Sequence, residues 1–207
     1  MQNNQENEVK FYLNDLAGFE KNLQGLGAEL IQPRVHEVNL RFDTPQGDLS
    51  RAHRVLRLRQ DEKVRLTYKS PAAASQQEVS SRQEIEFEAD SFENARLFLE
   101  ALGYEVMVSY EKFRATYQLN TVQIMLDEMP FGNFIEIEGP DPLSIQTVAA
   151  ALHLNWQARC LQSYMMLFEQ AQASRGIRLS NLTFAELDGL NLTAADLGLI
   201  PADRKIL

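Results

Sequence analysis

The chain has 207 residues, with 29 Asp and Glu against 20 Lys and Arg, which gives a formal net charge of −9. Hydrophobic residues make up 44 % and charged residues 24 %, a composition typical of globular proteins rather than of disordered or collagen-like ones. The negative charge disfavours binding to nucleic acid or an anionic membrane. With neither a secretory signal nor an apolar run of about 20 residues, we expect a cytoplasmic protein.

Strands and helices follow one another along the chain in a mixed order. Period-two alternation indicates strands, and apolar residues at helical spacing between caps indicate helices. In chain order, the predicted elements are a strand at 9–13, a helix from 14 or 15 to 26, strands at 29–43, 53–60, 63–69 and 78–88, a helix at 91–102, strands at 104–119, 122–127 and 134–138, and helices at 144–152 and 157–173.

The hairpin made by the strands at 53–60 and 63–69 has a predicted register. An odd loop of three residues is required if its basic side chains are to share one face. In this register Arg59 lies opposite Lys63, and Arg57 lies opposite Arg65. The same alternation places Arg54 on the other face.

The remaining segments are predicted to lie outside the strands. Residues 71–77 indicate a surface loop, and residues 175–207 indicate short helices whose caps are Thr183 and Thr193. No internal repeat is found, so we expect one domain, with a main unit at 1–174 and a helical extension at 175–207 packed on it. The lone Cys160 lies in the helical pattern and cannot form an intramolecular disulfide.

Charged residues alternate along nearly every predicted strand. Glu136 and Glu138 are interleaved with aliphatic residues that must face a core, so the two carboxylates point to the opposite side. The same spacing recurs in Glu6, Glu8 and Lys10, in Arg57 and Arg59, in Thr67 and Lys69, in Arg82, Glu84 and Glu86, and in Lys112 and Arg114. On any single strand, a solvent-exposed face is the simpler interpretation.

The recurrence of this pattern indicates a closed sheet. If the charged faces curve toward one another, the sheet becomes a barrel with a polar interior and helices outside. Such an interior holds cations and carboxylates in separate clusters. Lys and Arg bind phosphate oxygens, and glutamates hold hard cations such as Mg²⁺ or Mn²⁺, so the pattern suits a polyphosphate ligand.

A set of ordered motifs between Glu6 and about Phe168 resembles the CYTH superfamily, also called triphosphate tunnel metalloenzymes. These motifs are Glu6-Asn7-Glu8-Val9-Lys10, which matches the family's ExExK signature, Leu56-Arg57-Leu58-Arg59, Leu66-Thr67-Tyr68-Lys69, Arg82-Gln83-Glu84-Ile85-Glu86, Glu111-Lys112-Phe113-Arg114, Asp127 with Phe134-Ile135-Glu136-Ile137-Glu138-Gly139, and Ser163-Tyr164. The resemblance implies an α+β fold, a closed eight-stranded antiparallel β-barrel with helices packed outside.

The resemblance also implies a role for each matching residue. The residues that resemble the ligands of one metal ion are three glutamates, namely Glu6, Glu8 and Glu138. Glu136 resembles a ligand of a second metal ion, and Asp127 is assigned to the metal side. The triphosphate-binding residues are Lys10, Arg57, Arg59, Lys69, Arg82, Lys112 and Arg114. The residues assigned to catalysis are Lys69, Glu84 and Glu86, where the glutamates position a second metal or the attacking water.

The leading hypothesis is a triphosphatase that uses Mg²⁺ or Mn²⁺ to hydrolyse inorganic tripolyphosphate or an organic triphosphate. Its first rival is a class IV adenylyl cyclase, which converts ATP to cyclic AMP and pyrophosphate. Its second rival is a polyphosphate- or nucleotide-binding module without catalysis, which the complete set of acidic positions disfavours. We expect a small-molecule triphosphate as the partner, with no nucleic acid or membrane; a homodimer is left open.

Overall fold

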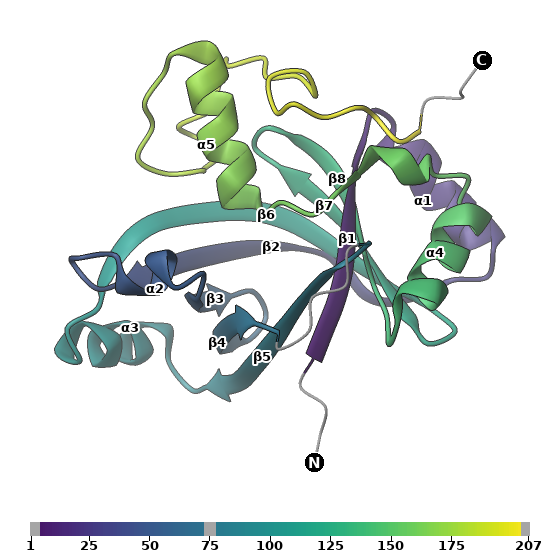
Figure 1. The fold of residues 1–207 in the computed structure, drawn as a ribbon. Helices are drawn as coiled ribbons and strands as arrows, with labels where there is room; N and C mark the ends of the chain where they lie inside the picture. The colour runs from purple at the N-terminus through teal and green to yellow at the C-terminus, as the bar shows by residue number, and fades with distance from the viewer. Residues whose placement is uncertain (1–4, 73–77, 204–207) are drawn as a thin grey trace.

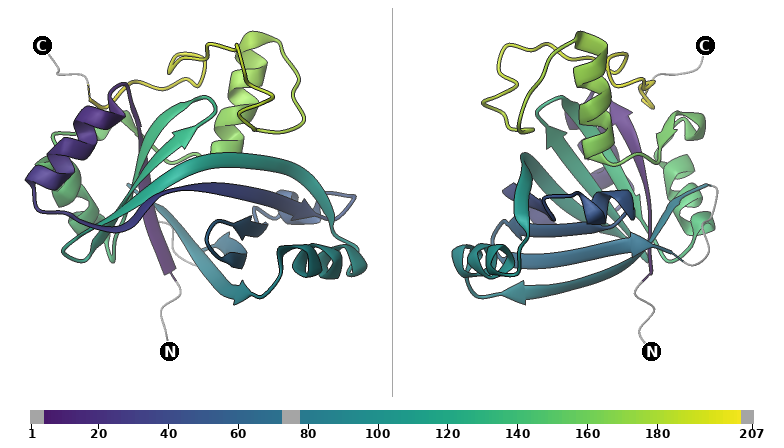
Figure 2. Two further views of the ribbon diagram at one scale, coloured as in Figure 1. Left: turned by 180° about the vertical axis from the view of Figure 1, so that it is seen from behind. Right: turned by 60° about the vertical axis from the view of Figure 1, so that its left-hand side comes forward.

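The computed structural model describes residues 5–72 and 78–203. Eight long strands form one antiparallel sheet in the order β5-β4-β3-β2-β6-β7-β8-β1, and β1 also pairs with β5, so the sheet closes on itself (Figures 1 and 2). The strands are β1 (Gln5–Leu13), β2 (Glu29–Asp43), β3 (Val55–Gln60), β4 (Val64–Pro71), β5 (Ser80–Ala89), β6 (Glu105–Leu119), β7 (Val122–Met129), β8 (Gly132–Glu138) and the short β9 (Arg159–Cys160). The predicted closed eight-stranded barrel is confirmed.

The helices lie outside the barrel (Figure 2). They are α1 (Leu16–Gly25), α2 (Asp48–Arg51), α3 (Phe92–Ala101), α4 (Pro142–Ala151), the 3-10 helix η1 (Trp156–Ala158) and α5 (Tyr164–Arg175). Their first turns have the side-chain caps that helix starts require, because Asp15 accepts a hydrogen bond from Gly18 N and Ser91 accepts one from Asn94 N. Helix α4 begins two residues earlier than predicted, since Asp141 caps it.

The hydrophobic core lies between the barrel wall and the helices rather than inside the barrel. Phe11 of β1 and Ile137 of β8 are fully buried and pack in one cluster with Leu23 of α1 and Ile145 of α4. A second cluster packs Leu99 of α3 against the outer face of β3 and β4. Because side chains alternate along a strand, this outward packing leaves the opposite set of side chains for the interior of the barrel.

The β3–β4 hairpin has the predicted odd loop but a different register. Arg57 lies opposite Thr67 and Arg59 lies opposite Arg65, so the predicted pairing is wrong by two residues along β4. The loop closes one residue later because Asp61 N donates to Lys63 O at 3.0 Å and the Asp61 carboxylate accepts from Lys63 N at 2.8 Å. A shift by an even number keeps every side chain on its predicted face.

The predicted helix at 157–173 is wrong in its first half. Asn155 caps only the short helix η1, after which β9 pairs with β1 opposite Lys10 and Phe11. Cys160 is therefore a buried strand residue and not a helical one. Helix α5 starts afterwards, where the Ser163 hydroxyl accepts a hydrogen bond from Met166 N at 3.3 Å.

The predicted short helices beyond residue 175 do not form between residues 176 and 203. The expected cap forms at Thr183, whose Oγ1 accepts from Glu186 N at 3.2 Å, but it stabilises a single turn. At Thr193 the hydroxyl instead donates to the Asp196 carboxylate at 2.7 Å. The main chain bonds to β6 instead: Leu182 N donates to Ser109 O at 2.9 Å, and Leu182 is fully buried. Residues 73–77 of the predicted surface loop and residues 204–207 lie outside the described residues, and no described helix is long and apolar enough to span a membrane.

Candidate active site

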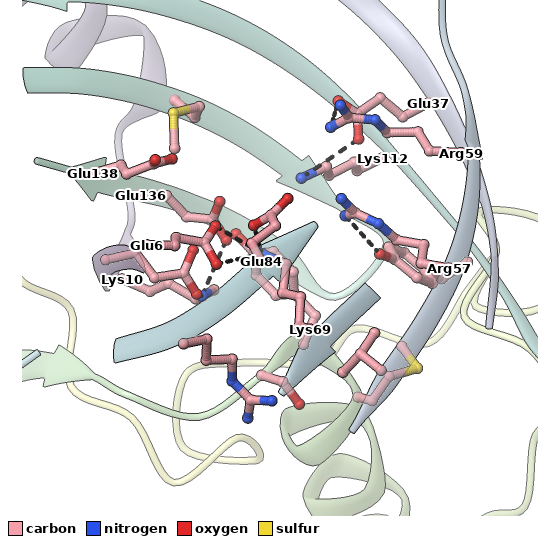
Figure 3. A pocket seen from close by; sticks show the side chains of 18 of the residues that line it. Glu6, Lys10, Glu37, Arg57, Arg59, Lys69, Glu84, Lys112, Glu136 and Glu138 are labelled. Carbon is pink, nitrogen blue, oxygen red and sulfur yellow. Dashed lines mark hydrogen bonds and ion pairs between the residues drawn. The ribbon is translucent and has the colours of Figure 1, made fainter. Parts of the chain in front are cut away.

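A cavity of about 640 Å³ lies inside the barrel and is lined by side chains from all eight long strands. Most of these side chains are charged, as the alternation along the strands predicts. Figure 3 shows them in two groups: Glu6, Glu84, Glu136 and Glu138 lie together with two lysines, and Arg57, Arg59 and Lys112 lie apart from them around Glu37. The site therefore separates a cation-rich part from a carboxylate-rich part.

The cation-rich part is built around Glu37 of β2, which is 1 % exposed. Its carboxylate lies 3.6 Å from Lys112 Nζ and 3.8 Å from Arg59 Nη1, and both of its oxygens lack a hydrogen-bond partner in the described residues. Burial alone would raise the pKa of Glu37, but the cations Lys112, Arg114 and Arg59 lower it to about 2. Glu37 is thus a fixed anion among cations that face the cavity.

Asp127 of β7 lies beneath the same cations and is fully buried. Its carboxylate accepts hydrogen bonds from Lys112 Nζ at 3.0 Å, Arg114 Nε at 2.6 Å and the Tyr164 hydroxyl at 2.8 Å. The family resemblance implied a place for Asp127 on the metal side, whereas this environment of three donors favours a role in positioning the two cations.

The carboxylate-rich part lies where β1, β5 and β8 meet. Glu8 and Glu138 are directly opposite each other across β1 and β8. Lys69 Nζ is 2.6 Å from Glu6 and 2.9 Å from Glu84, while Lys10 Nζ is 2.6 Å from Glu8.

Glu138 forms no ion pair or side-chain hydrogen bond with any other described residue. Burial, followed by repulsion from Glu6 and Glu8, raises its pKa to about 7. Repulsion of this kind is relieved when a cation enters the cluster.

These carboxylates have the donor chemistry of a hard-cation site. Mg²⁺ and Mn²⁺ prefer carboxylate oxygens, and the unpaired Glu138 is the group that a cation would stabilise most. Within residues 5–72 and 78–203, no three acidic, His or Cys side chains are already arranged around one point as metal ligands. The lysine contacts of Glu6 and Glu8 account for this, because each carboxylate is turned toward an ammonium group.

The other predicted site residues lie at the border between the two parts. Glu86 accepts a hydrogen bond from Thr67 at 2.7 Å and lies 3.3 Å from Arg59 Nη2. Glu136 contacts Lys10 at 3.2 Å and forms a very short ion pair with Arg114, so cations surround it. Arg82 lines the cavity and donates to the carbonyl oxygen of His53 at 3.2 Å.

Several cavity residues were not predicted from the sequence. Glu37, Arg41, Tyr110 and Tyr164 all line the cavity. The predicted placement of Arg54 on the opposite face is wrong, because Arg54 precedes β3, where strand alternation does not apply, and it lines the cavity.

Comparison with known proteins places this geometry in a family. The model of the CYTH domain matches residues 4–153. None of the curated proteins compared with the chain matches it. Among solved structures, a protein from Vibrio parahaemolyticus, provisionally named an adenylate cyclase, is 23 % identical over 81 % of this chain and 99 % of its own, with a TM-score of 0.71.

Two further structures share the fold. A protein from Pyrococcus horikoshii is 26 % identical over 77 % of this chain and 97 % of its own, with a TM-score of 0.65. A Hippeastrum protein, provisionally named an adenylyl cyclase and described as having a dominant triphosphatase activity, is 20 % identical over 84 % of this chain and 97 % of its own, with a TM-score of 0.58. Since the domain model matches well over half of the residues, the chain belongs to the CYTH domain family, whose members are enzymes.

Proposed function

We propose that this protein is a divalent-metal-dependent triphosphatase that hydrolyses its substrate inside the barrel. The observation that carries the proposal is the division of one cavity into a cation-rich part and a carboxylate-rich part with an unpaired Glu138. The lysines and arginines of the first part would bind a phosphate chain, and the carboxylates of the second part would hold a divalent metal ion. The match to the CYTH domain and the triphosphatase activity attributed to the Hippeastrum protein support it.

In this proposal the residues of the chain bind and orient the substrate. Arg57, Arg59 and Lys112 donate to phosphate oxygens, and Asp127 keeps Lys112 and Arg114 aimed at the cavity. Mg²⁺ or Mn²⁺, held by Glu6, Glu8 and Glu138, would supply charge neutralisation at the phosphoryl group. Glu84 and Glu86 lie on β5 beside these parts and orient the attacking water, while Lys69 fixes Glu6 and Glu84. Water then attacks the terminal phosphorus in line, the P–O bond to the rest of the chain breaks, and orthophosphate and the remaining diphosphate leave.

A class IV adenylyl cyclase is the second candidate, and one observation favours it. At the end of the cavity where β2 starts and β6 ends, five uncharged side chains line it beside Glu136 and Glu138, namely Ile31, Gln32, Thr116, Gln123 and Met125. Amide and hydroxyl groups beside apolar side chains suit a neutral ring such as a nucleobase better than another phosphate.

A product assay separates the two candidates. The protein is incubated with tripolyphosphate, thiamine triphosphate or ATP, each with Mg²⁺, with Mn²⁺ and with EDTA, and both orthophosphate and cyclic AMP are measured. We expect orthophosphate from at least one substrate only when metal is present. Cyclic AMP with pyrophosphate as the main product from ATP would establish the cyclase instead, and binding without any product would establish a binding module.

The folded protein should also be stabilised by its ligand. When the cavity is empty, Glu138 is repelled by Glu6 and Glu8, and Arg41 is repelled by Arg57 and Arg82. A triphosphate with metal supplies opposite charges to both groups in the folded state alone. At a hundredfold excess over the dissociation constant, this adds about 2.7 kcal/mol to the free energy of unfolding. Thermal melts should shift upward with tripolyphosphate plus Mg²⁺, less with either alone, and hardly with orthophosphate. An unchanged melt at saturating tripolyphosphate and metal would contradict ligand binding in the barrel.

A further inference from the structure

Three arginines that line the cavity differ from every other cation there. Arg41, Arg54 and Arg82 form no ion pair with any carboxylate among residues 5–72 and 78–203. All the other lysines and arginines of the lining form at least one, namely Lys10, Arg57, Arg59, Arg65, Lys69, Lys112 and Arg114. We call these three residues the unpaired arginine cluster.

The fold brings the cluster together at the end of the cavity next to α2. Arg41 of β2 lies directly opposite Arg57 of β3, so it adjoins the cation-rich part. Arg82 lies near the start of β5 and donates to the carbonyl oxygen of His53, the residue before Arg54. The cluster therefore extends the row of phosphate-binding cations beyond Arg57 toward this end of the cavity.

Arg41 is the member of the cluster whose missing partner is clearest. Its Nε is buried without a hydrogen-bond partner among the described residues. Burial lowers the pKa of Arg41, and the like charges of Arg57 and Arg82 lower it further, while Tyr110 and Asp43 offset only part of this shift. Taking a charged group out of water without a counter-ion is costly, so such an arrangement persists where an anion supplies the missing partner.

No carboxylate among residues 5–72 and 78–203 forms an ion pair with the cluster. Asp43 lies two residues from Arg41, but its carboxylate accepts hydrogen bonds from the backbone N–H groups of Thr44, Leu49 and Ser50. Glu169 of α5 also lines the cavity, yet it forms no ion pair with any of the three arginines in the described part of the chain.

We propose that the unpaired arginine cluster binds a fourth phosphate, so that the protein prefers a linear polyphosphate of four or more phosphates over tripolyphosphate. The inference rests on the proposed binding of a phosphate chain in the barrel and names the class of chain. Guanidinium groups bind phosphate oxygens in pairs through their fixed fork of donors, which suits a cluster of arginines rather than lysines. Opposite residues of an antiparallel pair lie about 5 Å apart, so a phosphate bound by Arg41 would be adjacent to a phosphate bound by Arg57.

Calorimetric titration with tripolyphosphate and tetrapolyphosphate, both in EDTA, tests this proposal without contributions from metal chelation. The wild-type protein should bind tetrapolyphosphate about tenfold more tightly, as expected for one additional charge-assisted contact. Arg41→Gln should remove most of this preference and change tripolyphosphate affinity less than threefold. Arg51→Gln is the matched control, because Arg51 is an exposed arginine of α2 that pairs with Asp48 and does not line the cavity.

The outcomes separate this inference from the proposed function. Equal affinities of the wild-type protein for both chains, or equal weakening of both by Arg41→Gln, would overturn the fourth-phosphate site while leaving triphosphate binding established. Absence of binding by either polyphosphate in EDTA would overturn this inference, and absence of binding also with Mg²⁺ would overturn the proposed function. Adenosine 5′-tetraphosphate, titrated in parallel, shows whether the fourth phosphate belongs to an inorganic chain or to a nucleotide.

Discussion

Glu138→Gln is expected to remove metal-dependent turnover while the barrel stays folded. The amide keeps the size of the side chain but cannot serve as an anionic ligand, and weakening even the outer partners of a metal site costs about 10- to 100-fold. We therefore expect a loss of at least about a hundredfold in turnover at saturating Mg²⁺. The side chain faces a polar cavity rather than the core, so far-ultraviolet circular dichroism should be unchanged.

The same variant should be more stable than the wild-type protein at neutral pH without metal. The pKa of Glu138 is about 7 in the folded protein, above its ordinary value of 4.5, because of burial and then repulsion from Glu6 and Glu8. Between these two values the folded state binds more protons than the unfolded state, so the stability of the wild-type protein falls as pH rises from about 4.5 to 7. Glutamine does not titrate, so the Glu138→Gln variant does not lose stability for this reason as the pH rises.

Thermal melts in EDTA at pH 5 and pH 8 measure the effect. The melting temperature of Glu138→Gln relative to wild type should be higher at pH 8 than at pH 5, and Mg²⁺ should stabilise the wild-type protein but not the variant. Glu93→Gln is the control, since Glu93 is an exposed helix residue paired with Arg96. A variant with near-normal turnover would show that Glu138 is not a metal ligand.

The side of the sheet on which a residue lies could be predicted because it depends on local alternation alone. Arg57 and Arg59 face the cavity, although their predicted partners on β4 lie two residues from the observed partners. An error of two residues leaves the face unchanged, whereas an error of one would reverse it. The closed barrel followed from the same alternation on many strands, together with helices that needed an apolar surface.

Residues on irregular backbone could not be placed in this way. Glu37 and Arg41 lie on a regular stretch of β2, but the register with β6 shifts twice before this stretch and once after it. Counting by twos from either end of the strand therefore does not give the face of these two residues. Arg54 lies just before β3, where no alternation exists. The helix predicted at 157–173 failed because β1 offers a pairing partner to residues 159 and 160, a contact between segments far apart in the sequence.

Which cation pairs with which carboxylate could not be predicted from the sequence either. Asp127 and Glu138 both follow strand alternation, yet one lies among three donors and the other has no partner among the described residues. Which of them could hold a metal depends on distances across the barrel, and those are set by the closure of the sheet. The two residues therefore differ in their expected response to mutation.

Asp127→Ala is expected to destabilise the protein far more than removal of a surface carboxylate. The substitution removes the carboxylate that accepts from two buried cations, Lys112 and Arg114, which keep only Glu37 and Glu136 among the described residues, and it leaves the Tyr164 hydroxyl without its acceptor. Breaking a buried pair by removing one partner typically costs about 3–5 kcal/mol, because the remaining charge stays out of water. Urea denaturation at pH 7 should show a loss of this size in the free energy of unfolding.

The neighbouring residue provides a matched control. Glu128 also accepts two hydrogen bonds from an arginine, Arg34, but that arginine is 51 % exposed, so Glu128→Ala should cost no more than about 1 kcal/mol. Tripolyphosphate should recover part of the stability lost in Asp127→Ala, because its phosphates give Lys112 and Arg114 a new anionic partner. Equal losses in the two variants would mean that the cations beside Asp127 are not held by its charge.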